Sequence, residues 1–322
     1  MTRSSLLLLI ASLAVAGGGV LVFSSYSSEI ERARAAVNNG GHIASTAAGP
    51  IEYAETGTGR PLLSIHGAGG GYDQGLAIAV ELVGDGFRVI APSRFGYLGT
   101  PIPADPSPRC QADAHAALLS ALKIDKAIVV GTSAGALSAI EVALRHPDRV
   151  SALILIVPAT YAPSSPVAIE ASRGSRFAFW LVNAGADFAW WATEKIAPSM
   201  LIRFIGVPPE VVATASPVQR ERAMRTVRRV QPLSARFSGI NIDSVPVRHR
   251  PELERIIAPT LIISARDDLF NTLPAAEFAA STIPNAKLIV FETGGHLLVG
   301  HDHEVRAIVG DFLAMAGVAP VV

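Results

Sequence analysis

The chain is poor in cysteine and has no excess of charge of either sign. Cys110 is the single cysteine among 322 residues, which excludes an intramolecular disulfide framework and a metal cluster held by several cysteines. The 27 Lys and Arg residues equal the 27 Asp and Glu residues in number. The basic footprint of a nucleic-acid-binding protein is therefore missing, and we expect no nucleic-acid partner.

Charged residues of both signs are scarce as well. They make up 17% of the chain, whereas 50% of the residues are hydrophobic, and an ordinary soluble domain has about 25% charged residues. This balance excludes an intrinsically disordered chain. The length suffices for one large domain, or for one domain with an insertion, around a sizeable core.

A long uncharged run lies near the N-terminus, at residues 6–23 (LLLLIASLAVAGGGVLVF). As a helix it would span roughly 27 Å, close to the ~30 Å hydrocarbon core of a bilayer. Three interpretations compete: a retained signal anchor, a signal peptide cleaved after Ala14-Val15-Ala16, and a buried helix of the fold. Apolar residues continue past Ala16, which favours the anchor. The sequence thus predicts a membrane-anchored or exported protein that contacts a membrane through residues 1–28.

The body of the chain alternates short apolar runs with helical patterns. Helices are expected at Asp105–Leu122 and Ala134–Arg145, where apolar residues recur every three or four positions. This alternation predicts an α/β fold with a mostly parallel sheet and helices on both faces. The expected strands are Ile51–Thr56, Pro61–His66, Phe87–Ala91, Ala127–Gly131, Leu153–Val157, Thr260–Ser264 and Lys287–Glu292.

Residues 159–250 break the alternation because they contain no convincing buried strand. All three tryptophans lie there (Trp180, Trp190 and Trp191), and we predict a helical cap inserted between two strands, with aromatic residues that form its core or line a pocket. The predicted segments are the N-terminal anchor or signal at 1–28, a short amphipathic helix and linker at 29–48, the core at 49–158, the cap at 159–250 and the rest of the core at 251–322.

The cap is basic, although the whole chain is neutral. It holds 12 Lys and Arg residues against 6 Asp and Glu residues, which leaves 15 against 21 for the remainder. Five arginines gather within it: Arg220, Arg222, Arg225, Arg228 and Arg229. A solvated helix face and a contact with anionic lipid headgroups both fit this cluster.

A serine in a tight turn is the first candidate for chemistry. Residues 131–135 read GTSAG and lie between an expected strand and an expected helix, the setting of a nucleophile elbow. Glycine at both ends lets the strand and the helix approach closely, because a side chain there would clash. The helix N-terminus beneath Ser133 also offers free N–H groups to a developing anion.

A serine nucleophile needs a base, and the base needs an orienting acid. Asp267 follows the strand expected at Thr260–Ser264, and His296 follows the strand expected at Lys287–Glu292. Both lie just past the carboxyl end of a strand, where open α/β sheets place their ligand sites. The chain order Ser133, Asp267, His296 is the order that this architecture uses.

A glycine-rich turn, HGAGGG at 66–71, follows another expected strand. Backbone N–H groups in such a turn can hold the oxyanion of a tetrahedral intermediate. We predict the N–H groups of Ala68 and Ala134 as the two donors, with Gly69 a competitor for the first. His66 is interpreted as a structural hydrogen-bonding group, since a triad uses one imidazole.

From about residue 50 to residue 312 the chain resembles the α/β-hydrolase superfamily. The resemblance rests on HGAGGG, GTSAG, SARDD at 264–268 and GGH at 294–296, with further likeness in APSRFGYLGTP at 91–101 and HPDRV at 146–150. It implies an α/β-hydrolase fold, a helical cap after the sixth strand and a triad of Ser133, His296 and an aspartate. The family's acid lies about three residues past the seventh strand, which favours Asp267 over the adjacent Asp268.

These features together predict a serine hydrolase that acts on a carboxylic ester or a related acyl group of a small molecule, through an acyl-enzyme. The same triad would serve in thioester hydrolysis or in cleavage of a carbon–carbon bond. A non-catalytic ligand-binding protein of the same fold is the alternative from another class. We expect no cofactor and no metal ion.

Overall fold

A single sheet organises the part of the chain that the computed structural model describes, residues 3–163, 187–245, 247 and 249–320. Its strand order is β1-β2-β4-β3-β5-β6-β7-β8. β1 and β4 each pair antiparallel with β2, and all other neighbours are parallel. The predicted mostly parallel sheet is confirmed. The strands are β1 (His42–Thr46), β2 (Gly49–Thr56), β3 (Arg60–Ile65), β4 (Phe87–Pro92), β5 (Ala127–Thr132), β6 (Val150–Ile156), β7 (Thr260–Ala265) and β8 (Lys287–Phe291).

The central strands are apolar because both faces of the sheet are covered. All six residues of β7 are buried, as are five of the six in β5. The register aligns Ile65 of β3 with Gly131 of β5, and Gly131 with Leu155 of β6. The loops that follow these three strands therefore start side by side at one edge of the sheet.

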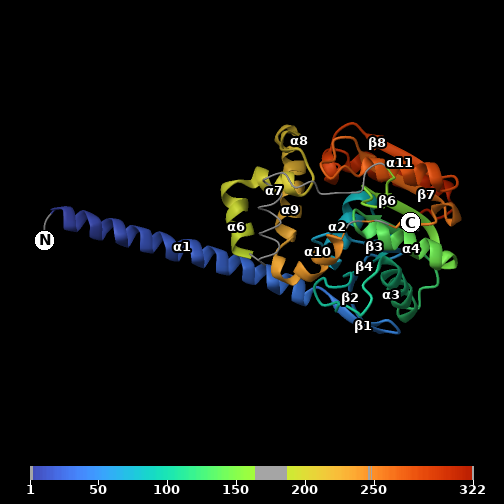
Figure 1. The fold of residues 1–322 in the computed structure, drawn as a ribbon, viewed down its shortest axis with the longest axis horizontal. Coiled ribbons are helices and arrows are strands. Elements are labelled where there is room, and N and C mark those ends of the chain that lie inside the picture. Colours follow the sequence, from blue (N-terminus) through green and yellow to red (C-terminus); the bar gives the residue numbers. More distant parts are fainter. Residues whose placement is uncertain (1–2, 164–186, 246, 248, 321–322) are drawn as a thin grey trace.

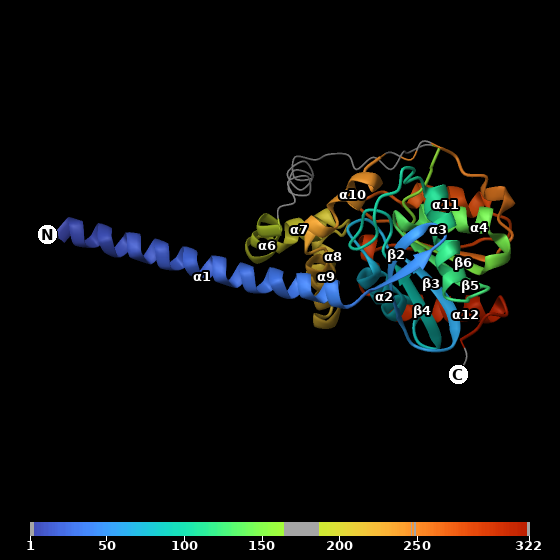
Figure 2. The ribbon, with the colours of Figure 1, turned by 90° about the horizontal axis from the view of Figure 1, so that it is seen from below.

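Two groups of helices cover the two faces (Figures 1 and 2). One core cluster joins the sheet to α3 (Pro108–Ala121), α4 (Gly135–Arg145) and α11 (Leu273–Thr282). The other cluster joins it to the segment after α2 (Tyr72–Ile78) and to α12 (Asp302–Met315). The start of α3 follows from its sequence: the Ser107 hydroxyl accepts the N–H of Cys110, and Pro108 occupies the first turn.

The described cap helices lie between β6 and β7 in the chain, as predicted. They are α6 (Asp187–Ile196), α7 (Pro198–Phe204), α8 (Pro209–Thr214), α9 (Pro217–Arg229) and α10 (Phe237–Asp243). Trp190 is fully buried in their shared apolar core, which also includes Val299 from the core domain. Trp191 packs edge-on against Tyr26, and Trp180 lies outside the described residues. The cap is thus packed directly onto the segment that follows β8.

The N-terminal region differs from the prediction. Residues 3–39 form one helix, α1 (Arg3–Asn39), which projects from the body with its N-terminus at the far end (Figures 1 and 2). The short amphipathic helix predicted from residue 29 is present as the C-terminal part of α1, whereas the linker predicted to follow it contains β1 at residues 42–46. The C-terminal part of α1 is packed: Ile30 and Val37 are buried, and the Tyr72 hydroxyl donates to the carbonyl of Val37 at 2.8 Å.

A membrane anchor is not supported at this helix. Among the residues that the structure describes, no helix combines the length and the apolar character needed to cross a bilayer. The anchor predicted at residues 6–23, the membrane contact and the membrane-anchored or exported localisation inferred from it are therefore wrong.

Candidate active site

Ser133 lies in the tight turn between β5 and α4. Its φ angle is 52°, a left-handed conformation that non-glycine residues rarely adopt and that marks strained functional turns. Its N–H donates to the carbonyl of Ile156 at 3.0 Å. A Cβ at Gly131 would lie 2.5 Å from the Cβ of Ala139, and one at Gly135 would collide with the carbonyl oxygen of His66. The two glycines therefore allow the turn that presents Ser133 above the sheet.

The imidazole of His296 is held by Asp268. Its Nδ1 lies 2.8 Å from Oδ2 of that carboxylate, and both side chains are buried. The other oxygen, Oδ1, accepts the N–H of Phe270 at 2.9 Å, and the Thr272 hydroxyl also donates to Oδ2. With Nδ1 facing Asp268, Nε2 is the ring nitrogen of His296 that is left for a partner in the cavity.

Asp267, the acid predicted from the sequence, does not contact the His296 ring. Its carboxylate accepts the N–H groups of Gly294 and Gly295 at 3.1 and 2.8 Å. The prediction placed the strand end at Ser264, whereas β7 continues to Ala265. Counting three residues from the observed end reaches Asp268, so the one-residue difference explains why the sequence pattern favoured Asp267.

Ser133 and His296 line one cavity of about 180 Å³ between the sheet and the cap. Apolar cap side chains cover it, and at one side Arg222 and Arg229 approach Glu81 to 3.6 and 3.4 Å. A cavity of this size suits a small, largely apolar substrate. The apolar cap residues are Phe204, Ile205, Val230, Leu233 and Ile240. Within the described residues, no group of three His, Cys, Asp or Glu side chains is placed to hold a metal ion.

The glycine-rich turn after β3, residues 66–71, borders the same cavity through Gly67, Ala68 and Gly69. Within the described chain the N–H groups of Ala68 and Ala134 donate to no protein atom, whereas the N–H of Gly69 donates to the Tyr97 hydroxyl at 3.3 Å. Ala134 follows Ser133 directly and borders an adjacent cavity of about 350 Å³. Ala68 therefore has a free donor at the cavity wall, and Gly69 does not.

His66 is engaged at both ring nitrogens. Nε2 accepts the N–H of Arg94 at 2.9 Å, so Nδ1 is assigned the proton that it shares with the carbonyl of Gly67 at 2.7 Å. Burial and the Arg94 charge hold the pKa of His66 well below its usual value. His66 is thus a neutral structural group, and His296 is the other imidazole close to Ser133's cavity.

The cap supplies contacts that sequence reasoning missed. The carbonyl of Gly206, between α7 and α8, accepts the N–H groups of both Leu269 and His296 at 3.1 Å. The guanidinium of Arg222 donates to the carbonyls of Leu297 and Leu298 at 2.8 and 3.1 Å. These bonds join elements that are far apart in the chain, so local sequence pattern cannot predict them. The cluster of arginines that includes Arg222 was the only sequence feature that pointed to this part of the site.

Comparison with known proteins agrees with this architecture. A family model described as alpha/beta hydrolase fold matches residues 60–300. The chain belongs to the alpha/beta hydrolase fold family. The fold predicted from the sequence, with its helical cap after the sixth strand, is thereby confirmed.

The relatives of this alpha/beta hydrolase are themselves hydrolases. A 2-hydroxymuconate semialdehyde hydrolase from Pseudomonas sp. (strain CF600) is 27% identical over 281 residues, 83% of this chain and 91% of that protein. A pimeloyl-[acyl-carrier protein] methyl ester esterase from Aromatoleum aromaticum is 28% identical over 78% of this chain and 96% of its own. Among solved structures, an alpha/beta hydrolase fold protein from Nakamurella multipartita matches with a TM-score of 0.68 and 28% identity, over 86% of this chain and 99% of that one.

Proposed function

We propose that this protein is a serine hydrolase that cleaves carboxylic esters of small molecules. In this proposal Ser133 is the nucleophile, His296 is the general base and Asp268 orients His296. The N–H groups of Ala68 and Ala134 hold the oxyanion. The observation that carries the proposal is the bond between Asp268 and His296 in a cavity that His296 shares with a serine in a left-handed turn.

The mechanism follows from these positions. Ser133 Oγ attacks the ester carbonyl while Nε2 of His296 takes its proton, and the carbonyl electrons move to the oxygen that the two N–H groups bind. Asp268 stabilises the resulting imidazolium through Nδ1–H. His296 then returns the proton to the leaving alkoxide, and water attacks the acyl-enzyme by the same route. The carboxylic acid is released and the free Ser133 hydroxyl is regenerated.

A fluorophosphonate probe tests the nucleophile. Wild-type protein should be labelled, and Ser133→Ala should not. Ser138→Ala is the matched control, because Ser138 is a buried serine of the following helix α4 whose hydroxyl donates to the carbonyl of Gly135. A folded wild type that resists labelling would instead favour a ligand-binding protein without catalysis. Rates on p-nitrophenyl esters should fall as the acyl chain outgrows the cavity of about 180 Å³.

A second candidate is cleavage of a carbon–carbon bond next to the carbonyl group of an aldehyde or ketone that carries a carboxylate. Two observations favour it. Arg222 and Arg229 face the cavity with Glu81 as their shared carboxylate, and the fourth charged side chain there, Asp243, is paired with Arg94. One positive charge is thus left over for an anionic substrate group. The activity named for the Pseudomonas relative is hydrolysis of 2-hydroxymuconate semialdehyde.

The two candidates are separated by one assay pair. Wild-type protein is given 2-hydroxymuconate semialdehyde and, separately, p-nitrophenyl acetate. If the second candidate holds, Arg229→Gln raises KM for the anionic semialdehyde and leaves KM for the neutral ester unchanged. Ester cleavage without turnover of the semialdehyde would contradict the second candidate alone.

A further inference from the structure

The glycine-rich turn at residues 66–71, hereafter the oxyanion turn, is fixed at three points. His66 bonds to the carbonyl of Gly67 and to the N–H of Arg94. The N–H of Gly67 donates to the side-chain oxygen of Gln74 at 2.9 Å. The N–H of Gly69 donates to the hydroxyl of Tyr97. The third contact differs from the others because it occupies the N–H of Gly69, which competes with the N–H of Ala68 as an oxyanion donor.

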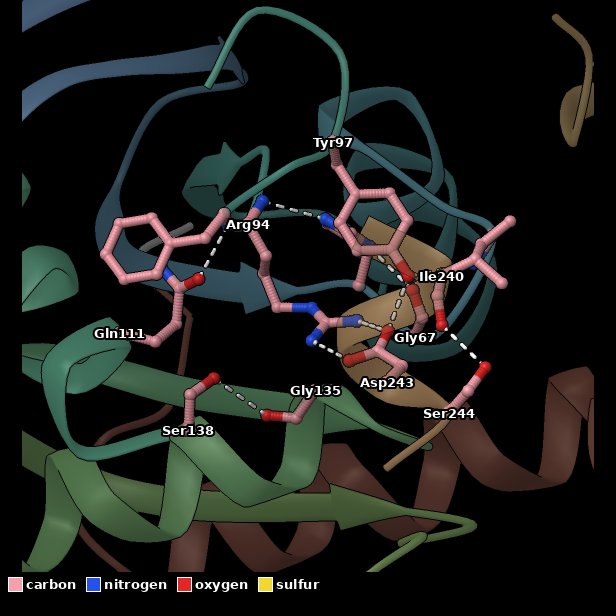
Figure 3. Close-up of polar contacts among 12 residues, drawn as sticks. Gly67, Arg94, Tyr97, Gln111, Gly135, Ser138, Ile240, Asp243 and Ser244 are labelled. Atoms are coloured by element: carbon pink, nitrogen blue, oxygen red, sulfur yellow. Dashed lines mark hydrogen bonds and ion pairs between the residues drawn. The ribbon is translucent and has the colours of Figure 1, made fainter. Parts of the chain in front are cut away.

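The Tyr97 hydroxyl has a defined direction. It donates to Oδ2 of Asp243, and Asp243 is itself bound through both oxygens by the guanidinium of Arg94, with 2.8 Å between Nη1 and Oδ1. Figure 3 shows the hydroxyl and the guanidinium converging on this one carboxylate. Burial and the Asp243 charge raise the pKa of Tyr97 well above its usual value, so the hydroxyl keeps its proton. Its lone pairs are then free to accept from Gly69.

We propose that Tyr97 is a positioning residue that selects the oxyanion donor. By accepting the N–H of Gly69, it holds that donor away from the oxyanion and sets the turn so that the N–H of Ala68 faces the reacting carbonyl. This inference rests on the proposed function. It decides between Ala68 and Gly69, the two donors that the sequence left in competition.

The positioning network reaches into the cap. Asp243 is the last residue of α10, a cap helix. The loop that carries Tyr97 is bound to the cap on both sides: Gly239 donates to the carbonyl of Gly96, and Leu98 donates to the carbonyl of Ala235, each at 2.9 Å. The Tyr97 ring also packs edge-on against His66 at 4.7 Å between centroids. The geometry of the oxyanion turn therefore depends on where the cap helix sits.

The test compares Tyr97→Phe with Tyr72→Phe. Tyr72 is also buried and also uses its hydroxyl in hydrogen bonds, but these go to the backbone of α1. For Tyr97→Phe we expect kcat on a p-nitrophenyl ester to fall about ten- to hundredfold, less than the 10²–10³ that outright removal of an oxyanion donor costs. KM should stay within about twofold, since the ground-state contacts are unchanged. Affinity for a trifluoromethyl ketone, whose serine adduct carries an oxyanion, should fall by the same factor as kcat.

Asp243→Asn separates positioning from general destabilisation. Its side-chain oxygen can still accept the Tyr97 hydroxyl, but Arg94 loses its charge partner. Of the two variants, we expect Asp243→Asn to have the lower urea midpoint and Tyr97→Phe to have the lower kcat. Two results would overturn the inference. One is a Tyr97→Phe enzyme with the kcat and the trifluoromethyl ketone affinity of wild type. The other is a loss of kcat in the two variants that follows the order of their urea midpoints. A folded wild type without labelling or turnover would refute the proposed function, and the inference with it.

Discussion

Two adjacent aspartates have different tasks at this site. The carboxylate of Asp268 contacts the imidazole of His296. The carboxylate of Asp267 accepts the N–H groups of the two glycines that precede His296 in the chain. Their residue type and their place after β7 are the same, so pattern alone could predict an acid here but not which one. The choice depends on where β7 ends and on the turn that follows, in which the N–H of Phe270 bonds to Asp268.

Asp268→Asn should therefore lower kcat on an ester by about 10⁴-fold, because an amide disfavours the productive tautomer and cannot stabilise the imidazolium. Asp267→Asn is the matched variant. Its oxygen still accepts one N–H, and we expect kcat within about tenfold of wild type, with a loss of about 1–3 kcal/mol in the free energy of unfolding. Steady-state kinetics and urea unfolding measure both. The opposite order of kcat values would restore the assignment predicted from the sequence.

A buried histidine makes stability depend on pH. Burial and the Arg94 charge lower the pKa of His115 from 6.5 to about 3, and its Nε2 lies 3.3 Å from the Ser138 hydroxyl. Below about pH 6.5 the unfolded chain binds a proton that the native protein does not bind, so the free energy of unfolding falls as pH falls. His115→Phe should flatten this slope by about 1.4 kcal/mol per pH unit between about pH 4 and 6. Urea unfolding across that pH range measures this slope. An unchanged slope in the variant would contradict the attribution of the pH dependence to His115.

At the scale of elements, apolar pattern predicted the buried strands well and the exposed ones poorly. β5, β6 and β7 lie where their Val, Ile and Leu runs indicated. β1 was missed because its five residues, HIAST, are mostly exposed and pair with β2 at the sheet edge. The C-terminal part of α1 is held against the body by contacts such as that from Tyr72 to Val37, which no local pattern indicates.

The turn between β5 and α4 depends on glycine for a steric reason. A Cβ at Gly135 would collide with the carbonyl of His66, at the start of the oxyanion turn. Gly135→Ala should lower the free energy of unfolding by about 3 kcal/mol and lower kcat as well. Gly310→Ala is the control: Gly310 lies within α12, has nothing within 4 Å of its added Cβ, and should gain about 0.5–1 kcal/mol. Equal effects on urea unfolding would remove the steric explanation.

At the scale of the whole molecule, the charge division between cap and core matches their interface. Arg222 and Arg229 of the cap face Glu81 of the core, and Arg236 of the cap pairs with Asp73 of the core at 2.8 Å. Three of the 12 basic residues that sequence counting located in residues 159–250 are thus paired with core carboxylates. The predicted alternatives for the arginine cluster, a solvated face or lipid headgroups, do not describe Arg222, whose side chain is buried.

Arg222 links this interface to the loop that carries His296. Its planar guanidinium reaches two carbonyls just after His296 and Glu81 at once, which a lysine ammonium on a flexible stem cannot reproduce. Arg222→Lys keeps the charge but should loosen the His296 loop, so we expect kcat about tenfold lower and unfolding about 1–2 kcal/mol easier. Arg225→Lys is the control, because Arg225 lies exposed on the same helix. If both variants keep wild-type kcat, the cap covers the cavity without holding the base in place.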